Sequence, residues 1–158
     1  MKKTAFISYS MDDSELYILS LISEYLVNND FYINTSFSSA SVGQNFEYQI
    51  NNQIKNSDLF IGISSENGIN SKWVHKEWEI AQNQGMNAIY IIENTITINN
   101  KFEQNNMVIR FDRQSPENSI VKLREMIEKQ KSEKSNKALN WVVGGLLGIA
   151  IIKLLSDE

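Results

Sequence analysis

The chain has 158 residues, of which 42% are hydrophobic and 22% charged, and it carries a formal net charge of -4. This composition is typical of one folded domain with a short appendage, and the acidic balance argues against a dedicated nucleic-acid binder, which usually presents a basic face. The absence of cysteine and the single histidine, His75, exclude thiol chemistry, thiolate zinc sites and multi-histidine metal sites. We therefore expect no metal ion, no bound cofactor and no nucleic-acid partner.

The amino-terminal residues show no pattern of a secretory signal. Met1 and two lysines lead into a short strand-like run rather than into a longer apolar core. Together with the absence of cysteine, this pattern is typical of a domain that lies in a reducing cytoplasm.

Apolar runs and helical periods alternate along the chain. Short apolar runs predict strands at 4–8, 31–34, 59–63, 87–93 and 107–111. Apolar residues at helical spacing predict helices at 14–28, at 44–56, from Trp73 to about Gln82, and at 115–131. Residues 35–43 are rich in serine and residues 94–106 are polar, so we expect loops there, the second with one short irregular piece.

This order predicts an α/β domain with a flavodoxin-like fold. Five parallel strands are expected in the order 2-1-3-4-5, with helices on both faces of the sheet. In that order a crevice forms between the carboxyl ends of the first and third strands. Two loops meet there, one carrying Tyr9 and Ser10 and the other leading to Trp73 and Glu77.

The last part of the chain changes character. A charged linker at 132–138 follows a domain of residues 1–131, and residues 139–155 hold no charge until Lys153. As a helix this segment would span roughly 25 Å, slightly less than the ~30 Å hydrocarbon core of a membrane. The lysines before it favour a cytoplasmic domain that this helix anchors in the inner cell membrane, and Gly144 and Gly148 would let two such helices approach closely. The alternative is a helix buried in an oligomer.

Several motifs resemble those of Toll/interleukin-1 receptor (TIR) domains, over about residues 4–130. The run 6–10 (FISYS) looks like the first signature box of that family, and 43–46 (GQNF) is similar to the end of its BB loop. Residues 71–77 (SKWVHKE) resemble the later signature Ser-x-Trp-Val-x-x-Glu. The motifs occur in the family's order and on the expected elements.

The resemblance implies one of two activities. Some TIR domains are non-enzymatic adaptors or scaffolds that assemble with other TIR domains. Others, widespread in bacteria and common in antiphage defence, cleave the nicotinamide–ribose bond of NAD+, and their catalytic glutamate maps onto Glu77. Trp73, Phe46, Tyr9 and Ser10 match positions that border the substrate. Many members have a basic residue in place of Ser10, so one possible phosphate contact is missing.

One carboxylate suits this chemistry. Nicotinamide in NAD+ is a cationic leaving group, so a carboxylate that stabilises the oxocarbenium-like ribose is sufficient without a general acid. We therefore expect an NAD+ nucleosidase (NADase) that releases nicotinamide and ADP-ribose or a cyclic product, activated by homo-oligomerisation as an antiphage effector. The alternatives are an adaptor without turnover and, as a third class, a flavodoxin-like binder of another nucleotide or a response-regulator receiver domain. Gly62-Ile63-Ser64 disfavours a receiver, which would end its third strand in a phospho-accepting aspartate.

The same residues also have structural interpretations. A glutamate early in a helix is most often an exposed residue that suits the helix dipole. Trp73 and Trp78 are typical packing aromatics, with Trp78 expected in the core or an interface. Ser64 and Ser65 lack a base that would activate them, so we expect them to be structural loop residues.

Overall fold

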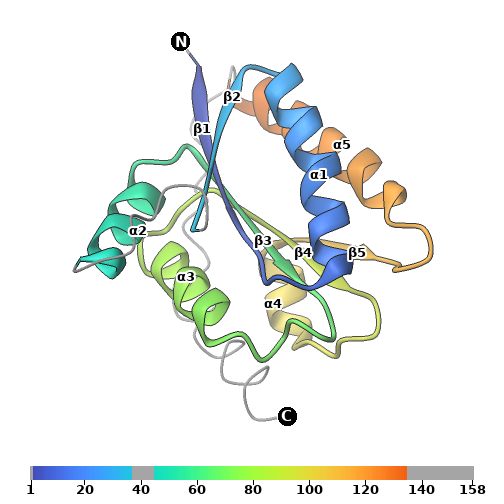
Figure 1. Ribbon diagram of the computed structural model, residues 1–158. Coiled ribbons are helices and arrows are strands. Elements are labelled where there is room, and N and C mark those ends of the chain that lie inside the picture. Colours follow the sequence, from blue (N-terminus) through green and yellow to red (C-terminus); the bar gives the residue numbers. More distant parts are fainter. Residues whose placement is uncertain (1, 37–44, 135–158) are drawn as a thin grey trace.

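The computed structural model describes residues 2–36 and 45–134 of the chain. Its strands form one sheet in which every neighbouring pair is parallel, in the order β2-β1-β3-β4-β5 (Figure 1). The strands are β1 (Lys3–Ser8), β2 (Phe31–Thr35), β3 (Leu59–Ser64), β4 (Ala88–Glu93) and β5 (Met107–Phe111). The predicted fold class and strand order are confirmed.

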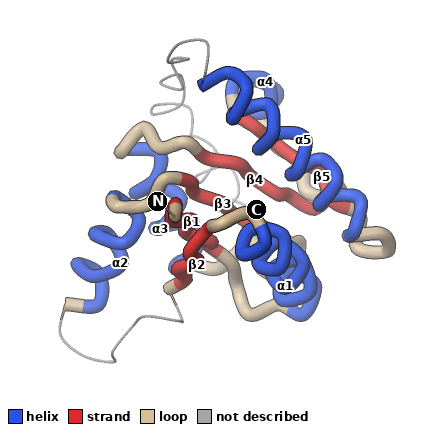
Figure 2. Tube along the Cα trace, turned by 90° about the horizontal axis from the view of Figure 1, so that it is seen from above, coloured by secondary structure: helices blue, strands red, loops and turns tan. Residues whose placement is uncertain are grey.

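Helices cover both faces of the sheet. They are α1 (Asp13–Asn28), α2 (Phe46–Lys55), α3 (Lys72–Asn83), α4 (Asn100–Asn105) and α5 (Glu117–Lys134). One hydrophobic core lies between the sheet and α1 and α5, and a second lies between the sheet and α2, α3 and α4. Figure 2 looks down on this arrangement, with α1 and α2 on opposite sides of the strands. Two covered faces explain why the strands are apolar almost throughout.

Polar side chains fix where the helices begin. Asp12 caps α1 by accepting a hydrogen bond from the Ser14 amide at 3.2 Å. Ser71 caps α3 by accepting from the Val74 amide at 3.4 Å. The cap at Ser71 therefore marks the start of the helix that carries Trp73 and Glu77.

The segment 94–106 differs from its prediction, because it contains the six-residue helix α4 rather than an irregular piece. Asn99 caps this helix by accepting from the Lys101 amide at 2.8 Å. Phe102 is its one buried residue. A single apolar anchor gives no helical period, which is why the sequence pattern does not reveal α4.

On β1 and β3 the side chains that face α3 become smaller toward the carboxyl edge of the sheet. Side chains alternate between the two faces of a strand, so Ser8 shares the face of Phe6, and Gly62 that of Phe60. A Cβ atom at Gly62 would lie 2.6 Å from the indole Nε1 of Trp78. The small residues therefore leave the room that the carboxyl-edge half of α3 occupies.

The predicted membrane anchor at 139–155 lies outside the described residues, as does most of the serine-rich loop at 35–43. Within 2–36 and 45–134, no helix has the length and apolar character needed to cross a membrane.

Candidate active site

Glu77 lies on the buried face of α3. It follows Val74 by three residues and precedes Ala81 by four, so the helical period places all three toward the sheet. Its side chain is only 1% exposed. The interpretation of Glu77 as an exposed residue that suits the helix dipole is therefore wrong, because its position on the helix directs it into the protein.

Four side chains from three segments surround the Glu77 carboxylate. Ser8 ends β1 and Ser36 follows β2, and both are fully buried. Trp73 comes from the preceding turn of α3. Tyr9 also lies near Glu77. Burial raises the pKa of the Tyr9 phenol, a hydrogen bond with Thr35 lowers it, and the negative charge of Glu77 raises it further.

Burial raises the pKa of Glu77 from its ordinary value of 4.5 to about 7. Ser36, Ser8 and the Trp73 indole oppose this rise, since each can donate to the charged form. Nevertheless, the two hydroxyls and the indole N–H make no hydrogen bond of good geometry among the described residues. The same is true of both carboxylate oxygens of Glu77. The donors therefore lie near the carboxylate outside good hydrogen-bond geometry, and they offset only part of the effect of burial.

Glu15, buried on the other side of the sheet's carboxyl edge, has the opposite environment. Its Oε1 accepts from the Ser10 amide at 2.7 Å, and its Oε2 accepts from the Ser10 hydroxyl at 2.7 Å. The Ser65 amide at 3.1 Å and the Ser65 hydroxyl also donate to Oε2. A Cβ atom at Gly68 would lie 2.0 Å from Oε2, so the glycine lets this loop close over the carboxylate. Glu15 thus holds the loops after β1 and β3 together.

Glu93, at the end of β4, is the third buried carboxylate of this edge, 2% exposed. It accepts from the Glu66 amide at 2.6 Å. The Arg113 guanidinium donates to both of its oxygens, at 2.9 and 3.1 Å. This bidentate pair ties the loops after β3 and β5 to the strand end. Like Glu15, Glu93 has its hydrogen-bonding capacity filled by the protein.

The predicted substrate-binding residues divide into two groups. Tyr9 and Trp73 lie beside Glu77, and Phe46 packs on Trp73 with ring centroids 4.5 Å apart. Ser10, by contrast, is engaged with Glu15, so the structure does not bring its hydroxyl into the Glu77 group. The sequence motifs single out neither Ser8 nor Ser36 as a neighbour of Glu77. The signal for Ser8 was its position two residues after Phe6, on the same face of the strand.

The family model of the TIR domain matches residues 5–124. The chain belongs to the TIR domain family. No curated protein sequence matches it.

Two solved structures share the fold of this TIR domain. A CMP N-glycosidase from Clostridium botulinum, BcmB, has a TM-score of 0.59 at 17% identity, over 77% of this chain and 99% of that one. The TIR domains of the activated Roq1 resistosome, which directly recognises the pathogen effector XopQ, have a TM-score of 0.55 at 11% identity, over 99% of this chain and 86% of theirs. At these identities the likeness shows a common fold.

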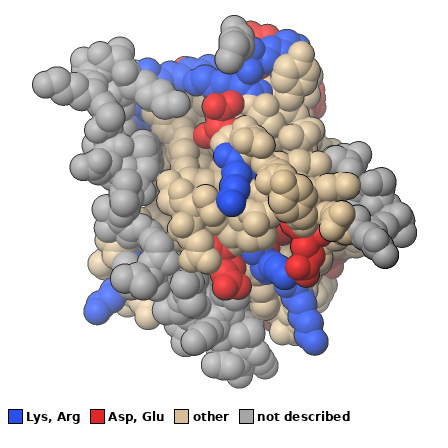
Figure 3. Space-filling view, turned by 90° about the vertical axis from the view of Figure 1, so that its left-hand side faces the viewer, with Lys and Arg blue, Asp and Glu red and all other residues tan. Residues whose placement is uncertain are grey.

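A small hollow between α2 and α3 leads toward Glu77 in this TIR domain. Besides Glu77, the side chains that line it are Glu47, Ile50, Trp73, Lys76 and Ile80. Lys76 is paired with Glu47 at 2.7 Å. Figure 3 views the side of the molecule that carries α2 and α3, and where its surface is visible it is mostly uncharged.

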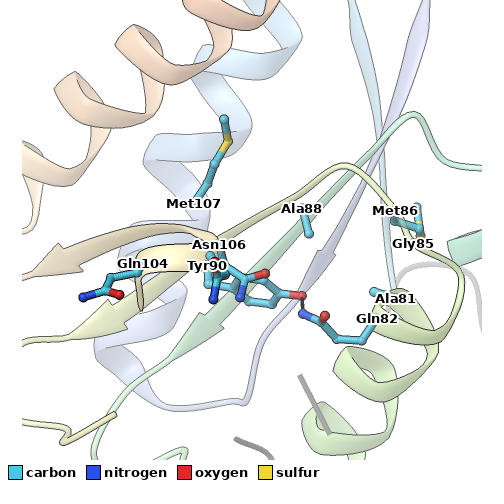
Figure 4. Close-up of a pocket in the computed structure, with 10 residues that line it drawn as sticks. Ala81, Gln82, Gly85, Met86, Ala88, Tyr90, Gln104, Asn106 and Met107 are labelled. Atoms are coloured by element: carbon cyan, nitrogen blue, oxygen red, sulfur yellow. Dashed lines mark hydrogen bonds between the residues drawn. The ribbon is translucent and has the colours of Figure 1, made fainter. Parts of the chain in front are cut away.

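A larger cavity of about 250 Å³ lies at the opposite, amino-terminal edge of the sheet, between the ends of α3 and α4 (Figure 4). Its polar lining consists of side-chain amides and of Tyr90, whose hydroxyl accepts a hydrogen bond from Gln82. No carboxylate or cation lines it. Among the described residues no group of three or more acidic, histidine or cysteine side chains is placed to hold a metal ion. Glu77 is therefore the buried carboxylate of the described TIR domain that neither an ion pair nor a hydrogen-bond network occupies.

Proposed function

We propose that this TIR domain is an NAD+ nucleosidase whose catalytic residue is Glu77. One observation carries the proposal. Of the three buried carboxylates at the carboxyl edge of the sheet in the described chain, Glu15 and Glu93 are hydrogen-bonded by the protein, whereas both oxygens of Glu77 are without a partner. Leaving a buried acid uncompensated lowers stability, and such groups are concentrated at functional sites.

The reaction requires little from the protein. The bond between ribose C1′ and the nicotinamide nitrogen breaks, and its electron pair moves onto the ring, which leaves as neutral nicotinamide. Positive charge develops on the ribose, where the Glu77 carboxylate stabilises it. A water oxygen then bonds to C1′ and loses its proton to solvent, which gives ADP-ribose. Attack by a group of the same nucleotide would instead give a cyclic product without consuming water.

A second candidate is cleavage of a pyrimidine nucleotide. It is favoured by the similar fold of the protein described as a CMP N-glycosidase and by the pKa of Glu77. Cytosine leaves more readily when it is protonated, and a carboxyl group with a pKa of about 7 is partly protonated at neutral pH. NAD+ remains the first proposal, because Glu77 stands at the position that the family's NAD+-cleaving members use.

The deciding experiment is incubation of concentrated protein with NAD+ and, separately, with CMP. Nicotinamide and cytosine are quantified by chromatography. We expect nicotinamide release that falls by ~100-fold or more in Glu77→Gln. Glu79→Gln is the matched control, because Glu79 lies on the same helix but is exposed. Its rate should equal that of the wild type.

Other outcomes would identify another function. Cytosine release that depends on Glu77 would select the second candidate. No release of either base, under conditions in which the protein assembles, would favour the non-enzymatic adaptor. Equal release by wild type and Glu77→Gln would remove Glu77 from its assigned role.

We also propose that the enzyme acts in antiphage defence and is activated by self-assembly. The burial of Glu77 in the single chain supports activation by self-assembly, since an unassembled enzyme with a closed site would not consume cellular NAD+. Phage challenge of cells that express the wild type or Glu77→Gln tests the role, and protection only by the wild type is the expected result.

A further inference from the structure

We propose that the cavity between the ends of α3 and α4 is a binding site for an uncharged, flat ring that carries an amino or carboxamide group. This cavity lies at the amino-terminal edge of the sheet, and Glu77 is not part of its lining. The inference therefore adds a second site to the molecule and does not depend on the proposed nucleosidase activity.

The side-chain amides of the cavity present their oxygen atoms. Gln82 donates through its nitrogen to the Tyr90 hydroxyl. Asn105 and Asn106 donate through theirs to main-chain carbonyl groups of α4, at 2.8 and 3.0 Å. None of these three side-chain oxygens accepts a hydrogen bond from a described residue, and none is a sealed buried atom. They are therefore acceptors that a bound molecule can reach.

The Gln82 amide is held in one orientation before any ligand arrives. Tyr90, its partner, is fully buried, and its ring packs against Trp78 and Phe102 with centroids 4.7 and 5.1 Å apart. Figure 4 shows Gln82 reaching from α3 toward the Tyr90 hydroxyl. A group that is already fixed loses little conformational entropy when a ligand binds, which favours recognition at this position.

The polarity of the lining determines the chemistry of the ligand. A carbonyl oxygen accepts hydrogen bonds and does not donate them, so the ligand must supply N–H or O–H groups. No carboxylate or cation lines the cavity, so a charged ligand would lose its hydration without gaining an ion pair. An amino group on an aromatic ring, or a primary carboxamide, supplies two N–H donors and carries no charge.

The size and walls of the cavity suit a single ring. Its volume of about 250 Å³ is below the range of ~300–1,000 Å³ that is typical of sites for drug-sized ligands, so a whole dinucleotide does not fit. Ala81, Ala88 and Met86 provide apolar surface for the faces of a ring. A Cβ atom at Gly85, which also lines the cavity, would meet nothing within 4 Å, so the cavity is open on this side.

Nicotinamide and adenine both have the required chemistry, the first as a carboxamide and the second as an amino heterocycle. The full chain is titrated with each compound and followed by the NMR shifts of its backbone amides. We expect saturable shifts at residues 81–90 and 104–107. Tighter binding of nicotinamide would identify a base released by the proposed reaction as the ligand, and tighter binding of adenine would identify a nucleobase.

Matched compounds test the role of the N–H donors without any change to the protein. In 3-acetylpyridine a methyl group replaces the amide nitrogen of nicotinamide, and in 6-methylpurine it replaces the amino group of adenine. We expect each to bind ~10-fold more weakly than its parent, the effect of losing a hydrogen bond to the amide oxygens. Equal affinity of parent and methyl compound, or no saturable shift around the cavity, would overturn the proposal.

Variants locate the binding. Gln82→Met removes the acceptor and keeps the length of the side chain, so the affinity at the cavity should fall by ~10-fold. Gln84→Met is the matched control, because Gln84 is exposed at the end of the same helix and does not line the cavity. Glu77→Gln should also leave the shifts around the cavity unchanged. Loss of these shifts in Glu77→Gln, with retention in Gln82→Met, would show that the ring binds at Glu77 instead and would overturn the proposal.

Discussion

Three glutamates of the described chain are buried at one edge of the sheet, and their surroundings assign them different roles. Glu15 and Glu93 accept hydrogen bonds from loop amides, serine hydroxyls or an arginine, and so fasten the loops around the site. Glu77 has no such bonds among the described residues. The first two carboxylates therefore stabilise the fold, whereas Glu77 destabilises it when charged.

Replacing Glu77 by glutamine should stabilise the protein at alkaline pH. The pKa of Glu77 is about 7 in the folded protein, above its ordinary value of 4.5. A carboxyl group whose pKa is raised by folding lowers the free energy of unfolding as pH rises from about 4.5 to 7, and the whole penalty persists above that range. The penalty is about 3 kcal/mol. Urea unfolding of wild type and Glu77→Gln at pH 8 should differ by up to this amount, and at pH 4 the difference should vanish.

Glu15→Gln is the matched control for this measurement. Its amide would present N–H donors to Ser10 and Ser65, which already donate to the carboxylate. We expect a loss of about 1.5–3 kcal/mol, the range for hydrogen bonds to charged groups. A gain in stability from Glu15→Gln, or a loss from Glu77→Gln at pH 8, would contradict the division of roles.

Much of the site could be predicted at the level of single residues, but the network around it could not. Glu77 and Trp73 belong to one short motif, so their proximity follows from the helix. Ser36 and Glu15 carry no local signal, and the strand alternation that gives the face of Ser8 does not show what lies opposite it. Their importance depends on partners that are distant in sequence, as with the contact between Glu15 and Ser65. The motif predicts that Ser10 borders the substrate, whereas in the structure its hydroxyl donates to Glu15. A sequence pattern does not show this contact.

At the scale of elements, the fit of α3 on β3 determines where Glu77 lies. Gly62 occupies the middle of a central strand, directly under the Trp78 indole. Gly62→Ala would place a methyl group 2.6 Å from the ring, and Trp78, 2% exposed, has no room to retreat. We expect the free energy of unfolding to fall by about 1–3 kcal/mol, the usual range for overpacking, as measured by urea denaturation.

Gly85→Ala provides the comparison for that prediction. Gly85 has a φ of +60°, but a Cβ there meets nothing within 4 Å, so only backbone strain of about 1 kcal/mol is expected. Adding Trp78→Phe to Gly62→Ala should restore part of the loss, because the smaller ring gives up the contacts that clash. Strictly additive effects of the two changes would show that the indole is not the obstacle.

The elements themselves were predictable wherever a side-chain period ran for several residues. Strands buried on both faces appear as short apolar runs, and α1, α2 and α3 have apolar positions repeated at helical spacing. The short helix α4 escaped because Phe102 alone anchors it. Periodicity therefore detects elements through burial, and an element with one buried residue leaves no period to detect.

At the scale of the whole molecule, the closed site raises the question of access. Glu77 is 1% exposed in the single chain, so a nucleotide reaches it only if the surrounding side chains move. In the proposed activation by self-assembly, contact with a second TIR domain would supply the free energy for that movement, since any interaction that favours the open form shifts the equilibrium toward it. Activity would then depend on protein concentration, unlike that of an enzyme with an open pocket.

Deleting residues 138–158 should lower specific activity in dilute solution. In the full chain the predicted hydrophobic helix would hold domains together on a membrane and raise their effective concentration. The truncated chain is not concentrated on a membrane, so its specific activity should rise with protein concentration. It should approach the specific activity of the full chain in vesicles only at high protein concentration. Recovery at high concentration is also the control that the site survived truncation. A truncated chain that stays monomeric by light scattering, yet cleaves NAD+ at an undiminished rate when dilute, would show that a single TIR domain opens its own site.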